Sequence, residues 1–162
     1  MLGILRPWLL WSLILTCLLG PLAAPVHATE LDSEPHLALM IGALWPGETT
    51  IHHDLSSMYE ILRHRGFATE EILLMQGLLT RRAILILLHD AHQRIRSWRQ
   101  GEVFVYVSGH GFYRGTSAAN AIPYLLLRQT GTPSSEEEVG WKEMLDTLAV
   151  PPTVRLTILP DA

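Results

Sequence analysis

Cysteine is almost absent from this chain of 162 residues, whose single cysteine is Cys17. That residue lies in an uncharged amino-terminal run, between Thr16 and Leu18, and it lacks the small preceding residue typical of a lipid-modified cysteine. Residues 18–162 therefore contain no thiol, which excludes both disulfide bonds and thiol catalysis by this part of the chain.

Basic runs and nucleotide-binding fingerprints are also missing. The formal net charge is -4, so we expect no nucleic-acid partner. No GxGxxG or Walker lysine follows a strand-like run, and we expect no cofactor. His52 and His53 beside Asp54, and His89 with His92, do not have the spacing of a strong zinc motif, so we expect no metal.

The amino terminus has the pattern of a secretion signal. Arg6 provides the positive start, residues 8–19 the apolar core, and Val26-His27-Ala28 a small-x-small cleavage site. We therefore expect residues 1–28 to be a signal peptide, 29–36 a short mature segment and 37–162 a single domain, exported to the periplasm or the extracellular space without a stable membrane span. An uncleaved anchor is the alternative, because residues 7–28 carry no charge and are long enough to cross a bilayer.

Strand-like and helix-like runs alternate after the signal. The pattern predicts strands at 37–44, 71–75, 103–107, 122–127 and 153–159, and helices at 54–65, 80–98 and 141–148. Asp54 and Thr80 are expected to cap the first two helices. Strands separated by helical crossovers pair in parallel, so we predict an α/β fold, a three-layer α/β/α sandwich with a mostly parallel sheet.

The stretch EVFVYVSGHG, residues 102–111, is the most informative in the chain. Its β-branched and aromatic residues indicate a buried central strand, and the strand runs directly into His110. The carboxyl ends of strands are where α/β sheets bind ligands, and the flanking glycines let the backbone turn sharply. A plain Ser-Gly-His-Gly turn is the structural alternative.

This motif and the element order resemble the caspase-like cysteine peptidases, the clan of caspases, metacaspases and legumains. The resemblance covers residues 37–162; its second specific feature is the ending LPDA, since the family places its cysteine about fifty residues after the histidine. It implies that His110 is the general base or orienter and that the Gly111 amide helps form an oxyanion hole. The nucleophile would come after Ala162, so we expect the domain to be incomplete at its carboxyl terminus and inactive as it stands.

The resemblance also suggests a substrate. Metacaspases, which cleave after Arg or Lys, have acids at positions that look like Asp54 and Asp161, and with Ser108 these are our candidate substrate-binding residues. Two carboxylates suit a cationic side chain of a peptide or protein substrate. Pro160 is unusual for the family at its position, and a helix cap is the plainer role for Asp54.

Two other functions remain open. The chain could be an exported pseudoenzyme whose cleft binds peptides or another subunit. A serine-type hydrolase using Ser108 and His110 is the other, although no Asp is evident to orient the imidazole and there is no GxSxG elbow. Because the sheet of a caspase-like domain continues past the cysteine, the resemblance also implies that the strand 153–159 or its neighbour has an open edge, which would favour self-association.

Overall fold

The computed structural model describes residues 34–117, 120–128 and 137–161. The expected signal peptide, its cleavage site and Cys17 lie outside these residues. Within the described part of the chain, no helix is both long and apolar enough to cross a membrane.

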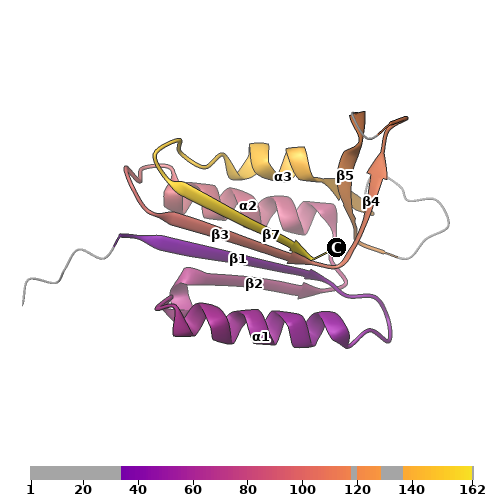
Figure 1. The fold of residues 1–162 in the computed structure, drawn as a ribbon, viewed down its shortest axis with the longest axis horizontal. Helices are drawn as coiled ribbons and strands as arrows, with labels where there is room; N and C mark the ends of the chain where they lie inside the picture. The colour runs from indigo at the N-terminus through magenta and orange to yellow at the C-terminus, as the bar shows by residue number, and fades with distance from the viewer. Residues whose placement is uncertain (1–33, 118–119, 129–136, 162) are drawn as a thin grey trace, which may run out of the picture. The chain divides into compact units, whose positions relative to one another are not determined.

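A four-stranded parallel sheet forms the centre of the fold (Figure 1). Its order is β2-β1-β3-β7, with bounds Ile72–Gly77, His36–Ala43, Glu102–Ser108 and Arg155–Asp161. β1 and β3 are interior strands, and their backbone groups are paired on both sides. Helices connect parallel strands because the chain must return to the same end of the sheet. The prediction of an α/β fold with a mostly parallel sheet is confirmed.

Helices cover both faces of this sheet (Figure 1). One face packs on α1, Thr50–His64, through a core that includes Met40, Leu55 and Tyr106. The other face packs on α2, Arg81–Ile95, and α3, Trp141–Leu148, in a larger core of alternate strand residues such as Ile41 and Val105. Alternation of side chains along each strand assigns every second residue to each core.

β1 and α1 approach closely at Gly42. A Cβ placed on this glycine would lie 2.2 Å from the Leu55 Cδ1 and 3.2 Å from the Ile51 Cγ2, and both side chains are buried. The absence of a side chain at Gly42 therefore allows α1 to pack at the carboxyl end of the sheet, next to the candidate site.

The start of α1 differs from the sequence prediction. The helix begins at Thr50 rather than near Asp54, so Asp54 is one turn inside it and does not cap it. Ile51 explains the earlier start, because its side chain is buried in the core beneath the helix. The predicted cap of α2 is confirmed, since the Thr80 Oγ1 accepts a hydrogen bond from the Ala83 amide at 3.2 Å. α2 ends at Ile95, one turn before the predicted Trp98.

A second, antiparallel sheet was not predicted. β4, His110–Arg114, pairs with β5, Ile122–Leu126, which also pairs with β6, Glu138–Gly140. The sequence prediction had no strand between 103–107 and 122–127, but the chain enters β4 at His110, with only Gly109 between it and β3. A short 3-10 turn, Thr69–Glu71, precedes β2.

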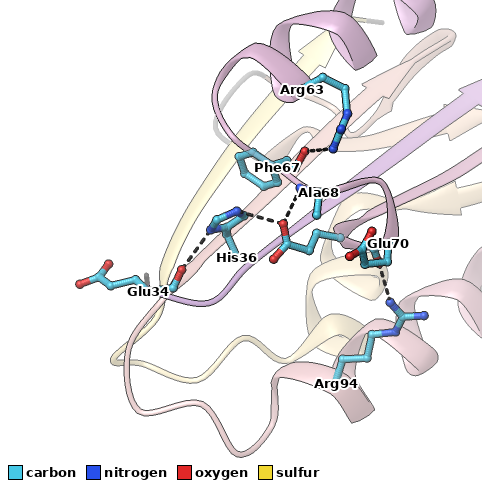
Figure 2. A network of polar contacts seen from close by, with 8 residues as sticks. Glu34, His36, Arg63, Phe67, Ala68, Glu70 and Arg94 are labelled. Carbon is cyan, nitrogen blue, oxygen red and sulfur yellow. Dashed lines mark hydrogen bonds and ion pairs between the residues drawn. The ribbon is translucent and has the colours of Figure 1, made fainter. Parts of the chain in front are cut away.

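The amino-terminal end of the sheet is held by a polar network (Figure 2). His36 lies between the Glu34 carbonyl, 3.0 Å from Nδ1, and the Glu71 carboxylate, 3.0 Å from Nε2. The same carboxylate accepts a 2.6 Å hydrogen bond from the Ala68 amide. Arg94 donates to the Glu70 carbonyl at 3.2 Å and so joins α2 to this turn. These contacts fix the start of β1 at the end opposite to the candidate site.

Candidate functional site

His110 is held by the loop that follows β1. Its imidazole stacks on the Trp45 indole, with ring centroids 3.7 Å apart and planes at 25°. Its Nε2 donates to the Glu48 Oε1 at 2.6 Å. A carboxylate accepting from Nε2 fixes the tautomer, so Nδ1 is the nitrogen of the neutral ring that can accept a proton.

The Trp45–Glu48 loop is organised for this contact. The Glu48 amide donates to the Trp45 carbonyl at 3.1 Å, and the Trp45 amide donates back to the Glu48 Oε2 at 3.3 Å. The hydrogen bond from His110 is the main cause that lowers the pKa of Glu48 below its usual value, with the Trp45 amide adding to it and partial desolvation opposing it. Glu48 is therefore a carboxylate at neutral pH, and it holds the histidine from a separate element.

A second polar group lies on the α1 face at the carboxyl ends of β3 and β7. The Tyr106 hydroxyl donates to the Asp161 Oδ2 at 3.0 Å. Ser108 is paired in register with Asp161 and is only 1% exposed. We call Asp54, Tyr106, Ser108 and Asp161 the Tyr106 cluster.

The pKa of Tyr106 reflects its surroundings. Burial is the largest cause that raises the pKa. The hydrogen bond to Asp161 and the charge of Asp161 raise the pKa further, to about 12. The charge of Asp54 acts in the same direction, whereas the hydroxyl of Ser108 opposes it. Both acids therefore place negative potential on one phenol, which keeps its proton and so can donate a hydrogen bond across the physiological range.

The structure brings together three of the five predicted site residues. Ser108, on β3, and Asp161, on β7, interact with Tyr106, and Asp54, on α1, lies close enough for its charge to raise the pKa of Tyr106. His110 makes its side-chain contacts with Trp45 and Glu48. Gly111 follows it in β4, where it is exposed and lines a groove of about 430 Å³ between the two sheets.

Three residues of the site were missed by the sequence reading. Glu48 is 62 positions from His110, and nothing in its local sequence distinguishes it from an ordinary surface acid. Trp45 follows the predicted strand 37–44 and was not singled out. Tyr106 was read as strand core, which is where it lies, but its position two residues before Ser108 on the same face could have indicated a polar role.

The other histidine groups do not form a metal site among the described residues, where no three His, Cys, Asp or Glu side chains are placed to hold an ion. His92 instead packs against α3. Its Nδ1 lies 3.2 Å from the Leu148 carbonyl, at the end of α3, and the side chain is half-buried between the two helices.

Neither a protein-family model nor a curated protein sequence matches this chain.

Proposed function

We propose that this chain carries the histidine part of a caspase-like cysteine endopeptidase site. Its carboxylates would bind a basic side chain of the substrate peptide. The observation that carries the proposal is the His110–Glu48 pair at 2.6 Å, at the carboxyl end of β3, next to the Tyr106 cluster. This is the end of a parallel sheet at which α/β proteins bind ligands. The order of the elements up to β7 supports the resemblance.

In the proposed site, Glu48 and Trp45 position the imidazole of His110. Nδ1 of His110 then accepts the proton of an attacking thiol and returns it to the leaving amine. The Gly111 amide would donate to the oxyanion that develops on the substrate carbonyl. Because residues 18–162 contain no cysteine, these residues alone bind peptide without cleaving it by thiol chemistry.

The Tyr106 cluster would select the substrate. Asp161 is exposed and Asp54 is half-buried, so a cationic side chain could reach both carboxylates. Tyr106 holds Asp161 in place by its hydrogen bond. A guanidinium, which donates from a planar fork, suits two acids better than a neutral side chain does.

The serine-hydrolase alternative is less well supported. Ser108 is 1% exposed, and a nucleophile must be reached by its substrate. Glu48 supplies the acid that orients the imidazole, which the sequence did not reveal, but the Ser108 hydroxyl interacts with Tyr106, whereas His110 bonds to Glu48.

Peptide binding tests the proposal without requiring turnover. Fluorescent peptides that differ only in Arg against citrulline should be compared by anisotropy with the protein purified from cells expressing the full chain. We expect the Arg peptide to bind more tightly, and Asp161→Asn to remove that preference. Asp90→Asn, an exposed acid on α2, is the matched control and should retain it. Equal binding of the two peptides by the unaltered protein would contradict the proposed specificity.

A further inference from the structure

We draw no further inference here: the strongest candidate, the aromatic-lined groove of about 430 Å³ between β4, β5 and β7, borders Gly111 of the site already described, and nothing in the structure shows what covers its apolar walls.

Discussion

Two hydrogen-bonded pairs of ionisable side chains lie at the carboxyl end of the sheet. His110 donates to Glu48, and Tyr106 donates to Asp161. The first contact fixes an imidazole with one nitrogen free for proton transfer, and the second fixes a carboxylate beside a buried phenol. The site therefore contains a positioned base and a positioned acid group on different elements.

Glu48→Gln should change the dependence of stability on pH. The folded pKa of Glu48 is lowered, so its ionised form adds stability above the unfolded value near 4.5, and this stability is lost as pH falls through the folded pKa. Urea unfolding should show the variant less stable than the parent near neutral pH, and equally stable at low pH. Glu60→Gln, an exposed acid on α1, is the control. If the difference in the free energy of unfolding between variant and parent were the same at low pH as at neutral pH, the contact with His110 would not be its cause.

Tyr106→Phe should remove the ionisation of a tyrosine whose pKa is raised by burial and by the contact with Asp161. The folded pKa of Tyr106 is raised to about 12, so its neutral form adds stability that is complete below about pH 10 and is lost as pH rises toward the folded value. A tyrosinate absorbance titration of the parent should contain a step near pH 12 that Tyr106→Phe lacks. Loss of a different step would contradict the burial and the Asp161 contact.

At the scale of elements, the two long helices differ at their amino termini. Thr80 caps α2 with its side chain, whereas Thr49 precedes α1 without such a bond. Thr80→Ala should therefore destabilise the protein by about 1 kcal/mol. Thr49→Ala should change it by less than about 0.5 kcal/mol. Chemical denaturation of both variants measures the difference, and equal losses would contradict the assigned caps.

Local patterns predicted the elements that are both amphipathic and connected to neighbours by short turns. The helix Trp141–Leu148 begins and ends where its apolar period indicates. The start of α1 was wrong because burial of Ile51 outweighed the capping preference of Asp54. The β4-β5-β6 sheet was missed because its strands are short and depend on pairing across intervening loops, which periodicity does not report.

Site residues were predictable only where a motif surrounds them. His110 stands out between two glycines after a buried strand. Glu48 and Tyr106 reach their roles through contacts across 62 and 55 sequence positions, respectively. Such contacts arise only when the parallel sheet brings the β1 loop, β3 and β7 to the same end.

At the scale of the whole molecule, the parallel sheet has two different edges. The β2 edge presents Leu74 beside α1, and the β7 edge presents Leu159 on the face of the Tyr106 cluster and Leu156 on the opposite face.

Catalysis by a completed site tests the central claim most directly. The chain is extended after Ala162 with a cysteine and the remaining strands of a caspase-like domain, and hydrolysis of an Arg reporter peptide is measured. We expect thiol-dependent turnover that His110→Ala lowers by about a hundredfold or more, as loss of a general base does. His89→Ala, an exposed histidine on α2, should retain the rate. A folded, extended chain whose turnover is absent, or unaffected by His110→Ala, would contradict the proposed role of His110.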